Sequence, residues 1–545
     1  MDADVLVVGG GLAGLVVATE VAAKGRRVFL LEQEPYLGGQ AYWSFGGLFL
    51  VDSPEQRRLG IRDSVELAFQ DWLGAAGYHR EEDYFGQLWA QAYLGFAAGE
   101  KRAWLASLGV RFFPVVGWAE RGGGLATGHG NSVPRFHIVW GTGPGLLEPF
   151  LRRVEALSAE GRLRVFLRHR VEEVLVEGGR AVGVAGVVLE EDPKPRGAPT
   201  SRKPLRDFTF RAQAVVLATG GMGANLDLVR RHWPEHMGKP PKRMLVGVPD
   251  HVDGSGLFLA ERAGARLVNL DRMWHYPEGV ENHSPIWTGH GIRILPGPSA
   301  LWVDATGKRL PPPLFPGFDA LETLRHLRHT GFDWSWFILD LRTLKKEFAL
   351  SGSEQNPDLT GRSWLQVLKN RLLGPAAPVR AFLERGKDFL VADHLSDLLR
   401  KMDALAPGVL DPVRLEAEIR ARDLELLNPF AKDGQVLALH AFRRYRGDRL
   451  FRVAKPAPFL SGKSPLVAVR LWTLTRKTLG GIQTDLKGRA LTPKGELLPG
   501  LFAVGEAAGF GGGGFHGSKA LEGTFLGGCL FTGRQTAKAL LEGLE

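Results

Sequence analysis

The protein has 545 residues, 44% of them hydrophobic, and a formal net charge of +10 at pH 7. This length and hydrophobicity predict a globular protein with room for more than one domain. The single cysteine, Cys529, excludes disulfides within the chain and cysteine-ligated metal centres, and no metal site is expected. The basic residues are scattered and form no recognition motif, so nucleic acid is not an expected partner.

Membrane insertion and export are not expected either. No apolar run approaches the roughly 18 residues that a membrane-spanning helix needs. The first apolar run begins close to Met1, which leaves no room for the basic and apolar regions of a signal peptide. We therefore expect no membrane span and a cytoplasmic location.

The first predicted elements form a βαβ unit. The apolar run Val5–Val8 predicts a buried parallel strand, residues 12–24 predict a helix, and residues 27–31 predict a second strand that ends at Glu32. The turn between strand and helix has G-x-G-x-x-G spacing, which suits a dinucleotide pyrophosphate at the helix N-terminus. An acidic residue about 20 positions later suits a pair of ribose hydroxyls. The three glycines are Gly9, Gly11 and Gly14.

The rest of the chain predicts an insertion into this nucleotide-binding domain. Residues 214–218 form another buried-strand pattern, and Gly500–Glu506 a further strand before a glycine-rich loop. Between them the chain becomes rich in proline clusters and tryptophan. We therefore expect the N- and C-terminal segments to close one cofactor site. The predicted division is 1–250 and 466–545 for the cofactor-binding domain, and 251–465 for a capping and substrate domain.

A set of motifs in fixed order carries a family resemblance. The chain resembles the flavoprotein superfamily of succinate dehydrogenase, fumarate reductase and 3-ketosteroid Δ1-dehydrogenase, and within it a bacterial branch of FAD-binding dehydrogenases. The resemblance implies an α/β fold in which a Rossmann-like FAD-binding domain is interrupted by a mixed α+β cap. The motifs are Gly9–Gly14 with Glu32, Leu37–Gly39 with Ser44–Gly47, Ala218–Gly221, Thr478–Ile482 and Gly500–Glu506.

The resemblance also implies how FAD is bound. Where succinate dehydrogenase has a histidine linked covalently to FAD, this chain has Ala41, Tyr42 and Trp43, so non-covalent FAD is expected. The glycine turn would meet the pyrophosphate, and later segments the adenosine, the ribityl chain and the flavin ring. The implied FAD-binding residues are Gly9, Gly11, Leu12, Ala13, Gly14, Glu32, Gln33, Gly38, Gly39, Gln40, Ser44, Gly46, Gly47, Val171, Ala218, Thr219, Gly220, Asn225, Gly505, Glu506, Thr524, Phe525 and Leu526.

The chemistry implied by the resemblance is hydride transfer between flavin N5 and carbon, with proton transfer at the adjacent carbon. It makes or reduces a C=C bond next to a carbonyl or carboxylate. This chain departs from both family patterns: Ala520 replaces the substrate arginine of fumarate reductase, and Phe515 replaces the catalytic tyrosine of the ketosteroid enzymes. Because the cap is rich in Trp and Phe, we expect a hydrophobic or ketosteroid-like substrate.

The candidate catalytic residues are therefore inferred from their own surroundings. His516, in the glycine loop, is the first acid/base candidate, with an exposed loop histidine as the alternative. Lys477 and Lys519 are candidate partners for an oxyanion or carboxylate, or else solvated or FAD-contacting lysines, and His275 and Tyr276 are further candidates.

Two other functions stay open at this point. One is a fumarate reductase-like flavoprotein subunit of an electron-transfer complex, and the other a flavin monooxygenase or oxidase. The expected partners are a small-molecule substrate and an unidentified electron acceptor or donor, and a homo-oligomer is compatible with the sequence.

Overall fold

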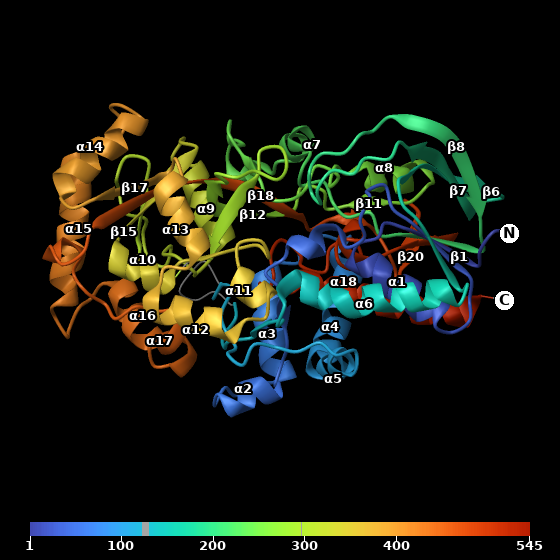
Figure 1. The fold of residues 1–545 in the computed structure, drawn as a ribbon, viewed down its shortest axis with the longest axis horizontal. Coiled ribbons are helices and arrows are strands. Elements are labelled where there is room, and N and C mark those ends of the chain that lie inside the picture. The colour runs from blue at the N-terminus through green and yellow to red at the C-terminus, as the bar shows by residue number, and fades with distance from the viewer. Residues whose placement is uncertain (123–129, 296, 545) are drawn as a thin grey trace.

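The computed structural model describes residues 1–122, 130–295 and 297–544. These residues form two main sheets, one in each half of an elongated molecule. Both chain termini lie at the end of the half that holds the six-stranded sheet (Figure 1).

The six-stranded sheet is parallel except at one edge. Its order is β20-β21-β9-β1-β2-β5, and only β20 runs antiparallel to its neighbour. Val5 and Val7 of β1 enter one hydrophobic core, and Leu6 and Val8 enter another, so the sheet is buried on both faces. The strands are β1 (Val5–Val8), β2 (Val28–Leu31), β5 (Leu163–Phe166), β9 (Ala214–Leu217), β20 (Arg489–Leu491) and β21 (Leu497–Ala503).

Helices cover one face of this sheet, and a smaller sheet covers the other. Helix α1 (Leu12–Ala22) packs against α6 (Thr142–Ala159) and α18 (Phe525–Gly543) in a shared core. The opposite core receives α8 (Ser255–Arg262) and an antiparallel three-stranded sheet. The Rossmann-like α/β fold predicted from the sequence is therefore confirmed. The small sheet consists of β6 (His169–Glu177), β7 (Arg180–Leu189) and β8 (Pro204–Arg211).

The second main sheet is built around one long strand, β18 (Leu466–Thr478). The path is β14-β15-β18-β12-β13-β16, and β10 and β17 also pair with β18. Because β18 is buried along most of its length, its apolar side chains hold strands from distant parts of the sequence. The other strands are β10 (Leu245–Val246), β12 (Met273–Glu281), β13 (Gly291–Leu295), β14 (Leu301–Asp304), β15 (Trp334–Asp340), β16 (Ala349–Leu350) and β17 (Phe389–Ala392).

Nine helices of the described chain surround this second sheet or extend from it, which gives that half a mixed α and β character (Figure 1). They are α9 (Ala320–Arg328), α10 (Leu341–Glu347), α11 (Pro357–Thr360), α12 (Trp364–Leu373), α13 (Ala377–Arg385), α14 (Leu395–Leu405), α15 (Pro412–Leu426), α16 (Gly434–Phe442) and α17 (Arg446–Phe451).

The remaining elements lie outside the two main sheets. Helices α2 to α5 lie beside the junction, and α7 follows β9. The sequence predicts that the cap ends at residue 465, but β18, which starts at Leu466, belongs to the larger sheet. The division into domains stays a prediction. The bounds are α2 (Pro54–Arg58), α3 (Val65–Ala76), α4 (Asp83–Ala98), α5 (Glu100–Ser107), α7 (Leu226–Arg231), β3 (Gly47–Phe49), β4 (Phe136–Ile138), β11 (Leu267–Val268) and β19 (Gly481–Ile482).

Candidate active site

A cavity of about 1590 Å³, including its open mouth, lies between the two halves of the molecule. Val8, Glu32, Ala218 and Val504 line it, at the carboxyl ends of β1, β2, β9 and β21. This edge of a doubly wound sheet is where such folds bind ligands. The cavity continues to residues of β12, β13 and β18 in the second sheet, so one space touches both halves.

The glycine turn has the geometry that a pyrophosphate requires. Gly9 has a φ of +107°, and a Cβ on Gly14 would lie 2.0 Å from the Gly9 carbonyl oxygen. A Cβ on Gly11 would have no heavy atom within 4 Å, and this residue lines the cavity. Helix α1 begins at Gly11 without a side-chain cap, so its first N–H groups are available to phosphate oxygens.

Glu32 is held as a ribose-binding carboxylate would be. One of its oxygens accepts a hydrogen bond from Gly10 N at 2.7 Å, and the other accepts one from Glu34 N at 2.9 Å. The side chain is buried yet lines the cavity, and burial raises the pKa of its carboxyl group. These features fit the adenosine end of a dinucleotide.

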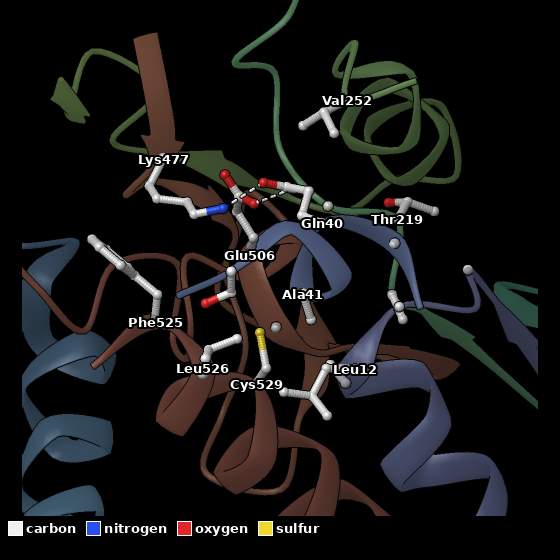
Figure 2. A pocket seen from close by; sticks show the side chains of 18 of the residues that line it. Leu12, Gln40, Ala41, Thr219, Val252, Lys477, Glu506, Phe525, Leu526 and Cys529 are labelled. Atoms are coloured by element: carbon white, nitrogen blue, oxygen red, sulfur yellow. Dashed lines mark hydrogen bonds between the residues drawn. The ribbon is translucent and has the colours of Figure 1, made fainter. Parts of the chain in front are cut away.

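The N- and C-terminal segments meet in a hydrogen-bonded chain of three side chains. Lys477 Nζ donates to Gln40 Oε1 at 2.5 Å, and Gln40 Nε2 donates to Glu506 Oε2 at 2.6 Å (Figure 2). Thr478 N donates to the other oxygen of Glu506 at 2.8 Å. Burial lowers the pKa of Lys477, and the nearby Glu506 carboxylate opposes this shift. Segments from both ends of the chain therefore meet at this one cavity.

Most of the implied FAD-binding residues line the cavity. These are Gly9, Gly11, Leu12, Ala13, Glu32, Gln33, Gly39, Gln40, Ser44, Gly47, Val171, Ala218, Thr219, Gly220, Gly505, Glu506, Phe525 and Leu526.

The other implied FAD-binding residues are not among those that line it. Gly14 lies behind the turn, and the turn residues Gly38 and Gly46 have positive φ angles of 120° and 84°. Asn225 caps α7 by accepting from Leu228 N at 3.1 Å, and Thr524 Oγ1 donates to the Leu521 carbonyl at 2.7 Å. Asn225 and Thr524 therefore have structural partners of their own.

On the side of the second sheet, the cavity holds a buried Tyr276–Glu522 pair. The Tyr276 hydroxyl lies 3.0 Å from each carboxylate oxygen of Glu522. The Arg293 guanidinium stacks 3.6 Å from the centre of the tyrosine ring, and its Nη1 lies 3.5 Å from Glu522 Oε1. All three residues line the cavity. Burial first, and then the Glu522 carboxylate, raise the pKa of Tyr276 well above its usual value.

Two guanidinium groups reach this part of the cavity. Arg293 is 3% exposed, and its Nε and Nη2 have no hydrogen-bond partner among the described residues. The nearest further charge is Glu278, whose Oε2 lies 3.7 Å from Arg293 Nε, and burial raises the pKa of Glu278 to about 7. Arg476 also lines the cavity, and its Nη1 donates to Ser351 Oγ at 3.3 Å.

Glu522, Arg293 and Arg476 were not predicted from the sequence. Arg293 lies beside Tyr276 because strand β13 pairs Arg293 with Gly279 of β12, close to Tyr276. Glu522 comes from the C-terminal glycine-rich segment, 246 positions from Tyr276. Only the strand pairing and the return of the C-terminal segment bring these residues together, and no local sequence signal marks them.

Of the two neighbouring candidates on β12, only Tyr276 lines the cavity. Successive side chains of a strand point to opposite faces. His275 accordingly stacks on Trp233, with 5.3 Å between ring centres, and burial lowers its pKa to about 4. The structure therefore does not place His275 where a substrate in this cavity could reach it.

His516 is fully buried and does not line the cavity, so it is not the exposed loop histidine of the alternative interpretation. Its Nε2 lies 2.7 Å from Thr524 Oγ1, and burial lowers its pKa well below the usual value. Two of its ring neighbours, Phe510 and Phe525, line the cavity in its place. The surrounding rings are Trp72, Trp274, Phe510, Phe515 and Phe525.

Lys519 is also outside the cavity lining. Its ammonium group pairs with Asp319 and lies 3.4 Å from Glu120 Oε1. Both carboxylates raise the pKa of Lys519, while burial raises that of Glu120 to about 8. This buried cluster joins the C-terminal loop to the start of α9, where Asp319 is the N-cap residue.

The fold and the cavity define a class of protein with a dinucleotide-binding sheet and a second, mixed α and β half that shares one cavity with it. Comparison with known proteins agrees: the FAD binding domain family matches residues 4–526. A KsdD-like steroid dehydrogenase of Mycobacterium tuberculosis (strain CDC 1551 / Oshkosh) is 57% identical over 550 residues, covering 100% of this chain and 97% of the relative. The chain belongs to the FAD binding domain family and, within it, to the KsdD-like steroid dehydrogenases.

Solved structures show the same fold at low sequence identity. A 3-ketosteroid Δ1-dehydrogenase from Sterolibacterium denitrificans, in complex with 1,4-androstadiene-3,17-dione, has a TM-score of 0.68 at 16% identity, covering 99% of both chains. A 3-ketosteroid-Δ4-(5α)-dehydrogenase from Rhodococcus jostii RHA1, in complex with 4-androstene-3,17-dione, has a TM-score of 0.61 at 21% identity, covering 99% of this chain and 96% of that one.

The expected superfamily and FAD as cofactor are thus confirmed, and the protein is an FAD-dependent oxidoreductase. The similarity to KsdD-like steroid dehydrogenases favours a dehydrogenase over a subunit of an electron-transfer complex and over a flavin monooxygenase or oxidase. Among the described residues, no helix is long and apolar enough to cross a membrane.

Proposed function

We propose that this enzyme dehydrogenates a carbon–carbon bond next to the ketone of a steroid-like substrate. One observation carries the proposal: a single cavity joins the implied FAD-binding residues to the Tyr276–Glu522 pair and two guanidinium groups. The names of the relatives, at up to 57% identity, support a steroid substrate. The aromatic side chains Phe45, Phe136 and Phe510 give the cavity an apolar surface that suits one.

Glu522 is the proton acceptor in this proposal. Tyr276 is buried and its pKa is raised, so its hydroxyl stays protonated and orients the carboxylate by donating to it. Glu522 takes the proton from the carbon next to the ketone. Bound FAD supplies the acceptor for the hydride that leaves the second carbon, and a C=C bond remains between the two carbons.

The ketone oxygen is assigned to the two guanidinium groups. Negative charge develops on this oxygen as the neighbouring carbon loses its proton, and fixed cationic donors stabilise that charge. Arg293 has two nitrogen atoms without hydrogen-bond partners among the described residues, although Glu278 lies 3.7 Å from one of them. The side chain of Arg476 donates to the Ser351 hydroxyl. Lys477 is already bonded to Gln40, and we propose that it contacts non-covalent FAD instead. An electron acceptor outside this chain completes the cycle.

The proposal is tested by anaerobic reduction of the bound flavin. We expect 4-androstene-3,17-dione or a saturated 3-ketosteroid to bleach the flavin absorbance, and Glu522→Gln to slow this step by about 10²–10⁴-fold with FAD still bound. Glu384→Gln, an exposed carboxylate on α13, is the matched control and should react at the native rate. Bleaching by C4-dicarboxylates but by no ketosteroid would overturn the substrate, and native-rate bleaching of Glu522→Gln would overturn the proton acceptor.

A further inference from the structure

Helix α12 presents an apolar face that is not covered by the rest of the described chain. Leu365, Leu368, Leu372 and Leu373 are 79%, 57%, 82% and 71% exposed. The helix is anchored from its other side, where Val367 is 4% exposed and packs in a cluster with Phe113 and Leu359. Leucines as exposed as these are unusual as a group on the surface of a water-soluble domain.

The spacing of these leucines makes a continuous stripe. Leu365, Leu368 and Leu372 are three and four residues apart, which places them on one side of a helix. The backbone of α17 lies next to the stripe and α10: the carbonyl oxygen of Leu450, whose side chain is 47% exposed, accepts from Lys346, and that of Phe451 accepts from Arg371 Nη1 at 2.9 Å.

A basic hollow lies directly beside the stripe. It is lined by Leu372 and Leu373 together with side chains of α10 and of the segment before β18, and no acidic residue of the described chain lines it. Its basic residues are Arg342, Lys345, Lys346, Arg371 and Lys463.

Most of these basic side chains are not neutralised by an acidic partner among the described residues. Arg342 pairs with Asp340 at 2.7 Å. Lys346 and Arg371 donate to backbone carbonyl groups, which satisfy a hydrogen bond without cancelling a charge. Lys345 and Lys463 are exposed. The neighbouring Arg371 and Arg443 add to burial in lowering the pKa of Lys346, a sign of crowded positive charge.

We propose that this surface, the α12 leucine stripe with the basic hollow beside it, docks the protein on a membrane that contains anionic lipid. The leucines enter the region between head groups and acyl chains, and the hollow receives lipid phosphate groups. Apolar side chains next to a cluster of lysine and arginine are the combination that binds such an interface. The docking is peripheral and needs no spanning segment.

Charge decides between a lipid surface and a second copy of this chain. A copy of the same stripe would bring another set of basic residues against the hollow, and like charges repel. A phosphate-rich surface supplies the opposite charge to the four basic residues of the hollow other than Arg342, which already pairs with Asp340. The inference rests on these exposed residues and not on the proposed substrate.

Vesicle binding by the FAD-loaded enzyme tests the proposal. We expect co-sedimentation with vesicles of phosphatidylglycerol and phosphatidylcholine in equal parts, and little with phosphatidylcholine alone. Leu368→Glu with Leu372→Glu should weaken binding at least about tenfold, and Lys345→Glu with Lys463→Glu at least about fivefold, with a weaker dependence on salt. Leu205→Glu is the matched control: Leu205 is 59% exposed on β8, which lies in the other half of the molecule from α12, and its variant should bind as the native protein does (Figure 1).

Each variant is first checked for bound FAD and an unchanged thermal midpoint, since all the positions are exposed. Absence of binding to the mixed vesicles would overturn the proposal, as would equal binding of the leucine variant and the native protein. A native dimer in light scattering that Leu368→Glu with Leu372→Glu converts to a monomer, without vesicle binding, would assign the stripe to contact between copies and also overturn it.

Discussion

At the scale of single residues, the surroundings of His516 indicate a structural role for this side chain. Its imidazole is enclosed by aromatic rings, and its Nε2 is bonded to Thr524 Oγ1. His516→Ala should leave a space between these rings and remove one of the two hydrogen-bond partners of the Thr524 hydroxyl. We expect the free energy of unfolding to fall by about 2–4 kcal/mol, measured by denaturant titration of the FAD-loaded protein.

The rate of flavin reduction distinguishes this structural role from the acid/base role expected from the sequence. If His516 only packs, flavin reduction by substrate should slow by less than about tenfold, whereas loss of a general acid or base costs about 10²–10⁴-fold. The exposed His329 supplies a control, because His329→Ala should alter neither quantity. Unchanged stability with a hundredfold slower flavin reduction would contradict the structural role and restore the acid/base assignment.

The residues that could be predicted are those whose role is local. Glycines in a fixed spacing and a carboxylate at a strand end carry their own chemistry, so Gly11 and Glu32 could be placed in the site from the sequence. His275 and Tyr276 are adjacent, and only the pairing of β12 decides which one faces the cavity. Glu522 and Arg293 reach the cavity through contacts between distant segments, and a linear pattern contains no such information.

At the scale of elements, the close contact between α1 and the turn before it can be tested by one substitution. A Cβ at Gly14 would lie 2.0 Å from the Gly9 carbonyl oxygen, so Gly14→Ala must displace either the turn or the helix. We expect a loss of about 1–3 kcal/mol in stability and isolation of the protein largely without FAD. The ratio of flavin to protein absorbance measures the second effect.

A second helical glycine provides the matched control for this substitution. Gly95 lies inside α4, and a Cβ there would meet no heavy atom within 4 Å. Gly95→Ala should therefore stabilise the protein by about 0.5–1 kcal/mol and leave FAD content unchanged. Equal behaviour of the two variants would show that close approach of α1 to the turn is not what Gly14 provides.

The difference between local patterns and contacts with distant segments also explains which elements could be predicted. The β1–α1–β2 unit has short, purely apolar strands and a glycine turn of fixed spacing, so its elements could be predicted from local patterns to within two residues. Strand β18 pairs with β10, β12, β15 and β17, and these partners lie far from it in the chain. Its membership of the larger sheet depends on those pairings, and so could not be predicted from its own residues.

At the scale of the whole molecule, the Lys519 cluster is a contact between the C-terminal loop and the cap helix α9. The carboxylates of Asp319 and Glu120 both face this one ammonium group. Asp319 and Glu120 also accept hydrogen bonds from the backbone of α9, at Glu322 N (3.0 Å) and Ala320 N (2.6 Å). Lys519→Met would leave the buried Asp319 carboxylate and the neighbouring Glu120 carboxyl group without their cation, and we expect a loss of about 3–5 kcal/mol in stability.

The sign of the pH dependence identifies the cause of that loss. Burial already raises the folded-state pKa of Glu120 to about 8, above its unfolded value, so protonation favours the folded protein and stability falls as pH rises toward that pKa. Removing the ammonium group of Lys519 raises this pKa further, because Lys519 is the main charge that lowers it. The destabilisation by Lys519→Met should therefore be larger above about pH 8, where the native protein loses the Glu120 proton, than at about pH 5. Thermal midpoints across this range measure it, with the exposed Lys538→Met as control. Adding Glu120→Gln should recover much of the loss, and a loss that is independent of pH would show that packing, not charge, holds the loop to the cap.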